Sequence, residues 1–449
     1  MASTALSDPK MMEEHRDSLE VLTKKVERLA NLVRASRHFI VFTGAGISTS
    51  AGIPDFRGPD GKWTREARGL TPLTGVSGVK AFPTLTHMSL VEMYNRSILK
   101  YVISQNCDGL HRRSGLPAKA ISELHGNGNI EICEDCDERY FRDFICFRMA
   151  KRFDHFTGRF CHCGGRLLNS TIDFGQHLDP GPLELAEEHS SKADLHLALG
   201  SSLSVSPACD FPASTAQKVG GRLVICNLQK TPLTEMADFQ IYAETDTVLG
   251  MLMEHLGIPV PPFRLLRRII VGTVANAKPP CVFAKAVDVH NASLEIGILR
   301  AVDWDGSGIA AVARKETEAI VAAKHGAHSR VATGLDLSKL RPTFHFVGNY
   351  GEPPFQVQAD LHSSVAVDVL MSFDPYELSW SCLRRTETAD YMTAMDATVA
   401  GSSNNLYGQA HREYCIDGVI KKYGKSRHEA VQIVEQNARE SIKKARAMC

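Results

Sequence analysis

Apolar residues recur at helical spacing near the start of the chain and in short runs after it. The helical spacing joins Leu19, Leu22, Val26, Leu29 and Val33. It predicts an amphipathic helix. The short runs, each followed by polar or small residues, predict strands at Phe39 to Thr43, Tyr101 to Ser104, Leu195 to Leu199 and Arg222 to Cys226. Strands alternating with helical stretches indicate an α/β fold, with a doubly wound parallel sheet that binds ligands at the carboxyl ends of its strands.

The pattern changes at the proline-rich segment Pro259 to Pro262. Beyond it, short stretches rich in branched and aromatic residues predict strands. These are Ile269 to Val274, Phe283 to Val289, Leu294 to Val302, Thr343 to Val347, Phe355 to Leu361 and Val365 to Leu370. We therefore expect a first domain over residues 1–260 and a mainly β domain, a sandwich, over 261–425. Ser426 and Glu429 form a capping-box pattern, which predicts a basic C-terminal helix within 426–449.

Composition narrows the function classes. The chain has 449 residues, 43% hydrophobic and 23% charged, enough for a large core and two to three domains. Its formal net charge is zero, so contact with nucleic acid or anionic lipid would require a local patch. We expect no secretory leader, transit peptide or membrane span. Twelve cysteines without a secretory signal favour reduced thiols or a metal site over disulfides.

The segment GAGISTSAGIPDFRG, residues 44–58, directly follows the first predicted strand. Its GAG turn leaves backbone N–H groups uncovered, so the chain can turn tightly and approach a pyrophosphate at the N-terminus of a helix. A bare glycine turn between a strand and a helix would have the same three residues. The continuation adds hydroxyl, acidic, aromatic and guanidinium groups to one loop, which favours phosphate binding.

Two further polar clusters are candidates for chemistry. SQNCDGLH, residues 104–111, follows a predicted strand and could orient a ribose and a carboxamide. The alternative is a helix-capping turn with Asn106 or Asp108 as the cap. ELHGN, residues 123–127, contains His125 beside a candidate metal module. Histidine suits general-base work near neutral pH, although an isolated histidine is more often a surface or core residue.

That metal module consists of two cysteine pairs. Cys133 and Cys136 form a CxxC pair, and Cys161 and Cys163 form a CxC pair after 24 intervening residues. Four thiolates at such spacing can hold one tetrahedral Zn²⁺ on a small lobe built of hairpins, a closed and therefore structural site. His162 could replace one thiolate, and unpaired buried cysteines are the remaining alternative.

In this order, the blocks GAGISTSAGIPDFRG, SQNCDGLH, ELHGN, CxxC with CxC, LGSSLSV and VICNLQ resemble the sirtuin family. The resemblance runs from about Leu19 to Gly257. GPDGKWT, residues 58–64, the stretch Leu167 to Phe174 and the direct step from the Arg57 loop to Trp63 resemble the nuclear class IV branch, in particular its nucleolar, seventh mammalian type. The resemblance implies a Rossmann-like fold with a zinc lobe over about residues 126–170.

The resemblance implies an NAD-dependent protein-lysine deacylase, in which the acyl group passes to ADP-ribose as nicotinamide leaves. His125, as base for the ribose hydroxyl, and Asn106 would be catalytic. The cofactor loop would be formed by Gly44, Ala45, Gly46, Thr49, Asp55, Phe56, Arg57 and Trp63. The ribose and nicotinamide would be held by Gln105, Asn106 and Asp108. The adenosine half would be surrounded by Gly200, Ser201, Ser202, Asn227, Leu228, Gln229 and Thr245. Residues 172–174 would pair with the substrate peptide as a strand.

Three positions depart from the family pattern and put the acyl-chain preference in doubt, namely Cys107, Gly128 and Gln176. The alternatives to a deacylase are an NAD-dependent protein mono-ADP-ribosyltransferase and a non-catalytic NAD-sensing chromatin scaffold. The expected partners are acylated lysines in proteins, including histones, and no membrane. Basic clusters at 421–427 and 443–446 could contact chromatin or nucleic acid. With the class IV resemblance, they predict residence in the nucleus or nucleolus.

Overall fold

The computed structural model describes residues 12–146, 153–161, 163–274, 281–287, 289, 299–303, 327–331, 341–346, 348–357 and 366–388. These residues belong to two compact units, one drawn from 1–127 and 171–263, the other from 128–170 and 264–449. The predicted domain boundaries stay predictions, and the predicted C-terminal helix lies outside the described residues.

The first unit contains a six-stranded sheet in the order β10-β9-β8-β1-β2-β3. Every neighbouring pair in it is parallel. Its strands are β1 (Phe39–Thr43), β2 (Leu99–Ser104), β3 (Ile121–Glu123), β8 (Leu195–Leu199), β9 (Arg222–Cys226) and β10 (Phe239–Ile241). The predicted Rossmann-like parallel sheet is therefore confirmed.

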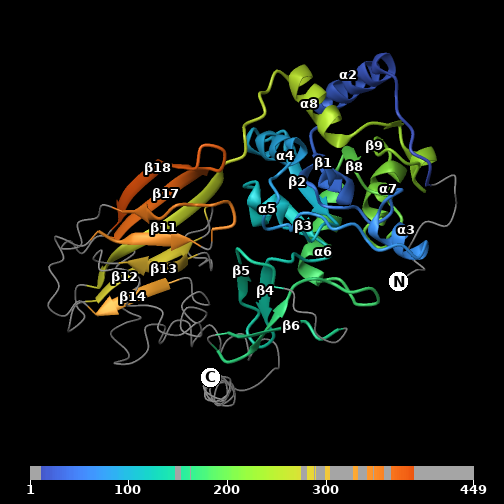
Figure 1. Ribbon diagram of the computed structural model, residues 1–449. Coiled ribbons are helices and arrows are strands. Elements are labelled where there is room, and N and C mark those ends of the chain that lie inside the picture. Colours follow the sequence, from blue (N-terminus) through green and yellow to red (C-terminus); the bar gives the residue numbers. More distant parts are fainter. Residues whose placement is uncertain are drawn as a thin grey trace. The chain divides into compact units, whose positions relative to one another are not determined.

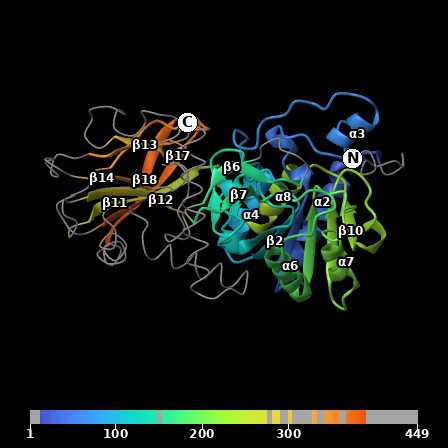
Figure 2. The same cartoon turned by 90° about the horizontal axis from the view of Figure 1, so that it is seen from below.

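Helices cover both faces of this sheet (Figures 1 and 2). One face is packed by α2 (Leu19–Ala35), α4 (Leu85–Asn95) and α8 (Thr245–Leu256), the other by α6 (Pro180–Lys192) and α7 (Asp210–Gln217). Phe39 and Val41 of β1 belong to the first core, whereas Ile40 and Phe42 belong to the second. This division follows from the alternation of side chains along a strand.

The predicted helical periodicity is confirmed in α2. Leu22, Val26, Leu29 and Val33 are buried on its inner face. Ser18 caps the helix, with its hydroxyl oxygen accepting from the Val21 amide. Shorter helices, α3 (Lys62–Ala67) and α5 (Leu110–Arg113), follow the glycine loop and β2. Among the described helices, none is both long and apolar enough to cross a bilayer.

The second unit begins with a small antiparallel sheet in the order β5-β4-β7-β6. It consists of β4 (Ile130–Cys133), β5 (Arg139–Phe141), β6 (Phe156–Phe160) and β7 (Arg166–Asn169). At its centre the buried Glu131 carboxylate accepts from Arg142 at 2.7 Å and from the Thr157 hydroxyl at 2.5 Å. These bonds compensate the charge of a carboxylate that is inaccessible to solvent.

The rest of the second unit is mainly β, as predicted. Five strands, β14 (Ala327–Val331), β12 (Cys281–Val287), β11 (Leu265–Val274), β17 (Ala366–Asp374) and β18 (Ser379–Thr388), form one antiparallel sheet. A second sheet contains β13 (Leu299–Asp303), β15 (Thr343–Phe346) and β16 (Phe355–Gln356). Both sheets contribute to one apolar core, as in a sandwich. The sequence prediction missed β14 and β18. The second of these is an edge strand whose residues 381–387 are exposed and largely polar, so no apolar alternation reveals it.

Candidate active site and metal cluster

Two glycine turns meet at the carboxyl edge of the parallel sheet. The Gly46 amide donates to the carbonyl of Gly200 at 2.8 Å, so the turns after β1 and β8 touch backbone to backbone. A Cβ on Gly46 would lie 2.8 Å from Cα of Gly200, and Gly200 itself has a φ of +58°. Only glycine allows this approach, which leaves room for a ligand beside the main chain.

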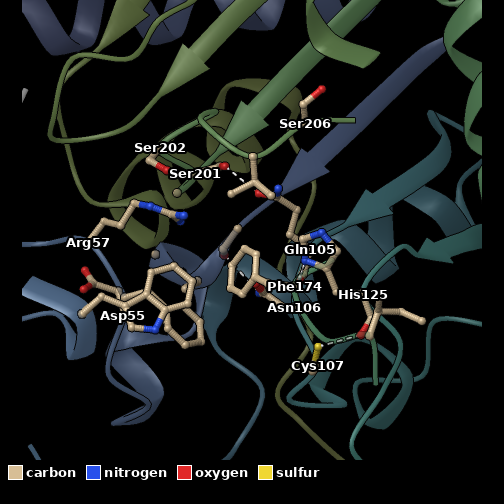
Figure 3. A pocket seen from close by; sticks show the side chains of 18 of the residues that line it. Asp55, Arg57, Gln105, Asn106, Cys107, His125, Phe174, Ser201, Ser202 and Ser206 are labelled. Carbon is tan, nitrogen blue, oxygen red and sulfur yellow. Dashed lines mark hydrogen bonds between the residues drawn. The ribbon is translucent and has the colours of Figure 1, made fainter. Parts of the chain in front are cut away.

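A pocket opens where the strands of this sheet end (Figure 3). The residues directly after β1, β2, β8 and β9 all line it, because the carboxyl ends of parallel strands meet at one edge. The structure brings together in its wall most of the predicted cofactor residues, namely Gly44, Ala45, Gly46, Asp55, Phe56, Arg57, Trp63, Gln105, Asn106, His125, Gly200, Ser201, Ser202, Asn227 and Gln229.

A second, smaller pocket shares Gly46, Gly200 and Asn227 with the first and adds the predicted residues Thr49, Leu228 and Thr245. Asp108 lines neither pocket. Its carboxylate accepts from the Ser48 hydroxyl at 2.7 Å and from the Leu110 amide at 2.9 Å, at the start of α5. Asp108 is thus held in the turn before α5, whose N-cap is Gly109, and its assignment to the cofactor stays a prediction.

Gln105 and Asn106 are fixed by bonds across the sheet edge. The side-chain nitrogen of Asn106, Nδ2, donates to the carbonyl of Gly44 at 3.0 Å. The side-chain oxygen of Gln105 accepts from the Ser201 hydroxyl at 2.9 Å. The Gln105 Nε2 atom is buried and has no partner among the described residues. A buried donor without a partner is expensive, which suits a group that meets a ligand.

His125 follows β3 and faces the pocket beside Gln105 (Figure 3). Its Nδ1 lies 3.1 Å from the carbonyl oxygen of Gln105. Because a carbonyl can only accept, Nδ1 carries the hydrogen and Nε2 is left with the lone pair. Burial and, to a smaller extent, the positive charge of Arg57 lower the pKa of His125. The imidazole is therefore neutral and basic at Nε2 near pH 7.

An aromatic wall closes another side of the pocket. The rings of Phe56 and Trp63 lie 4.5 Å apart, and those of Trp63 and Phe174 lie 5.5 Å apart. The Arg57 guanidinium stacks 4.4 Å from the Trp63 ring centre. Burial lowers the pKa of Arg57 to about 10, so it remains charged at neutral pH. Phe174 belongs to the predicted peptide-binding segment, which is not a strand in this chain and whose Ile172 amide donates to the carbonyl of His125.

Sequence reasoning missed part of the pocket lining. Gly58, Val205, Ser206 and Pro207 also line the pocket. The Ser206–Pro207 step is a turn signal four residues after the predicted Gly200 to Ser202 cluster, and could have extended it. Cys107, singled out for its unusual residue type, lines the pocket as well. Its thiol donates to the carbonyl of His125 at 3.1 Å, and burial raises its pKa to about 12.

The four predicted metal ligands are brought together beside β4 and β7. Cys133 Sγ lies 3.4 Å from Cys163 Sγ, and Cys136 Sγ lies 3.6 Å from Cys161 Sγ. These separations are far too long for disulfides and near the roughly 3.8 Å expected between thiolates on one tetrahedral zinc. All four thiols are buried, and they form a group that can hold one Zn²⁺. His162 lies outside the described residues.

Comparison with known proteins extends these observations. A model described as the Sir2 family matches residues 72–207. The chain is 46% identical over 257 residues to NAD-dependent protein deacetylase SRT1 of Arabidopsis thaliana, a match that covers 56% of this chain and 53% of that protein. It is 44% identical over 263 residues to NAD-dependent protein deacetylase sirtuin-7 of Rattus norvegicus, covering 56% and 64%.

NAD-dependent protein deacetylase Sirt6 of Drosophila melanogaster is 42% identical over 255 residues, and the match covers 55% of this chain and 80% of that protein. The chain thus spans between half and two thirds of the Arabidopsis and rat relatives, and most of the Drosophila one.

Proposed function

The chain belongs to the Sir2 family, the sirtuins, and we propose from this that it is an NAD-dependent protein-lysine deacylase. The relatives named sirtuin-7 and Sirt6 agree with the predicted class IV branch. The observation that carries the proposal is the setting of His125, a neutral imidazole with Nδ1 bonded to a backbone carbonyl and Nε2 available in a pocket at the carboxyl edge of the sheet.

NAD fits the residues of this pocket. The turns at Gly44, Gly46 and Gly200 keep side chains away from the backbone, so a pyrophosphate can approach their N–H groups. The unpartnered Gln105 Nε2 offers a donor for the ribose or carboxamide half. When bound, NAD supplies an electrophilic ribose carbon that accepts the acyl oxygen of the substrate lysine as nicotinamide leaves.

The residues of the chain would orient and deprotonate the reacting groups. His125 would take a proton from a ribose hydroxyl at Nε2, because its Nδ1 is held by the Gln105 carbonyl. Asn106, bonded to Gly44, would keep its side chain fixed beside the reacting carbon, where a preorganised dipole stabilises developing charge without reorganisation. Phe56, Trp63 and Phe174 would exclude water.

The four-cysteine group supports a structural zinc rather than a catalytic one. All four positions of a tetrahedral ion would be filled by thiolates, so no site would remain for water or substrate. We propose that Cys133, Cys136, Cys161 and Cys163 hold this ion and that it stabilises the small antiparallel sheet around them.

One incubation tests the proposed activity. The full chain is mixed with adenylate-labelled NAD and an acetylated lysine peptide, and nicotinamide, acyl-ADP-ribose and protein-bound label are followed. We expect nicotinamide and acyl-ADP-ribose to appear in equal amounts, and only when the peptide is acetylated. Label on protein without acyl-ADP-ribose would indicate an ADP-ribosyltransferase instead. Absence of any turnover, with NAD still bound, would favour a scaffold.

We further propose that the enzyme acts in the nucleus on chromatin proteins, including histones. The similarity to sirtuin-7 and the two basic clusters at 421–427 and 443–446 support this, and both clusters lie outside the described residues. Binding to nucleosomes should weaken steeply as salt rises, because neutralised phosphates release counterions.

Replacing Lys421, Lys422, Lys425, Arg427 and Lys443 by glutamine should lower that salt dependence and move a fluorescent fusion out of the nucleus. Glu429, Glu435 and Glu440 dilute the charge of the same region, so a merely solvated helix face is the competing interpretation. Unchanged localisation together with salt-independent binding would establish that interpretation.

A further inference from the structure

The segment before α2 lies along the edge of the adenosine-side pocket. Glu14 forms an antiparallel bridge with Gln229, and the His15 amide donates to the carbonyl of Leu228 at 2.8 Å. The Gln229 side chain returns a bond to the carbonyl of Met12 at 3.1 Å. Residues 12–17, here called the N-terminal strap, therefore pair with the loop that follows β9, which carries three of the predicted cofactor residues.

The C-terminal end of the strap is also held by hydrogen bonds and ion pairs. The Asp17 amide donates to the carbonyl of Tyr242, and the Tyr242 amide donates to the Asp17 carboxylate. The same carboxylate accepts from Lys25 at 2.7 Å. Arg16 is bonded to Glu244 and lies 3.9 Å from Glu14. These contacts hold the strap across the loops on both sides of β10.

Through this placement the strap contributes a wall of the pocket. Glu14 lines the smaller pocket together with Leu228, Thr245 and Glu244. Asp55 and Asp246 line it as well, but their carboxylates are occupied by the Gly58 amide and by Thr86 and Ser50. The described lining residues of this pocket include no lysine, arginine or histidine. Its wall is therefore acidic, and Arg16 offsets only part of that charge from outside the lining.

In nucleotide-binding folds, one carboxylate near the adenosine ribose favours a free 2′-hydroxyl, whereas a cation accommodates a 2′-phosphate. That carboxylate usually stands about 20 residues after the glycine motif. Here the remaining carboxylates of the pocket come from Glu14, ahead of α2, and from Glu244, ahead of α8, whose carboxylate also accepts from its own backbone amide. Both are joined by Arg16 of the strap.

We propose that the N-terminal strap is part of the cofactor site and that Glu14, with Glu244, makes the adenosine end select NAD over the 2′-phosphorylated NADP. This inference rests on the proposed function, since it assigns a role at the same NAD site. A carboxylate within a few ångströms repels the phosphate dianion and is expected to weaken NADP binding by about tenfold.

Calorimetric titration of the full chain with NAD and with NADP tests the proposal. Glu14→Lys should tighten NADP binding at least tenfold relative to NAD, because it replaces repulsion by attraction. Glu13→Lys is the matched control, since the neighbouring Glu13 is exposed and lines neither pocket. The control should leave the ratio of the two affinities unchanged.

A chain shortened to begin at Asp17 should bind NAD about tenfold more weakly, because one wall of the pocket is lost while Asp17 keeps its bonds to Tyr242. Should this shortened chain fail to fold, the two point variants still decide. If the wild type binds NAD, but Glu14→Lys and Glu13→Lys have the same ratio of NADP affinity to NAD affinity, the inference is overturned. A wild type that binds no NAD would instead overturn the proposed function.

Discussion

At the scale of single residues, backbone shape decides where a ligand can lie. Gly200 combines a left-handed backbone with a neighbour so close that any Cβ would lie 2.7 Å from the carbonyl carbon of Gly46. Gly220 has a φ of +78°, but a Cβ added there would have no atom within 4 Å. Substitutions at these two glycines therefore distinguish the effect of backbone strain from the effect of steric contact.

Gly200→Ala should reduce NAD affinity by at least tenfold, because the two turns must move apart and disturb the N–H groups that face the pocket. Gly220→Ala carries the same left-handed strain, about 1–2 kcal/mol, but should leave NAD affinity unchanged. Calorimetric titration with NAD, together with thermal unfolding of both variants, measures the two effects. Equal losses of affinity in the two variants would mean that strain alone is responsible.

His125→Ala should lower deacylation by about 10²- to 10⁴-fold while NAD binding persists, because the imidazole acts as a base and does not anchor the dinucleotide. In the wild type, burial lowers the pKa of His125. The enzyme should therefore remain active at pH values just below the ordinary histidine pKa. Its activity should fall only at more acidic pH, as Nε2 becomes protonated. Turnover of the variant near the wild-type rate would contradict the assignment.

At the scale of elements, the small antiparallel sheet carries the four buried cysteines that can hold one metal ion. Cys133 ends β4 and Cys161 follows β6, so one ion would join the C-terminal ends of these two strands. The Tyr140 hydroxyl on β5 lies 3.1 Å from Cys161 Sγ and can donate to a thiolate there. The binding free energy of a structural zinc is folding free energy.

Purified protein should contain one zinc per chain, and chelation should unfold residues 128–170 before the parallel sheet. Metal analysis and proteolysis of the chelated protein measure both. Cys163→Ala should lose the metal, whereas Cys209→Ala, at a half-buried cysteine outside the cluster, should retain it. Zinc retained by the Cys163 variant would identify His162 as a substitute ligand, and far less than one zinc per wild-type chain would refute the site.

At the scale of the whole molecule, stability should depend on pH through three buried histidines. Burial lowers the pKa of His87 to about 4 and those of His111 and His196 to about 3. In the unfolded chain each would titrate near 6.5, so between these values the unfolded state binds more protons. Their contribution is fully present above pH 6.5 and is lost as the pH falls below it, by about 1.4 kcal/mol per pH unit for each histidine.

The slope of unfolding free energy between pH 6 and pH 4.5 should therefore be smaller in His196→Gln, by up to about 1.4 kcal/mol per pH unit, because one group that binds a proton only in the unfolded chain is removed. His177→Gln, at an exposed histidine, is the control and should keep the wild-type slope. Denaturant titration at each pH provides the measurement. A slope that is the same in both variants would show that His196 does not contribute.

Much of the fold could be predicted because it is encoded in neighbouring residues. The buried faces of α2 and β1 repeat with the period of their element, and the glycine turn and the cysteine pairs are contiguous patterns. Edge strands such as β18 escaped because an exposed polar strand shows no apolar alternation. The family resemblance assigns Asp108 to the cofactor, and this stays a prediction; the bonds of its carboxylate to Ser48 and Leu110 depend on packing that the motif does not show.

By itself, then, the sequence determined the parallel sheet, the family, the glycine turn and the four cysteines, because each rests on local periodicity or on a short motif. Only the tertiary structure decided which distant residues meet. It brings Glu14 to the wall that also contains Glu244, and it places the buried Arg267 between Asp143 and Glu352. Hydrophobic periodicity reports which side of an element faces a core, whereas the partner of a charged side chain depends on how separate segments pack.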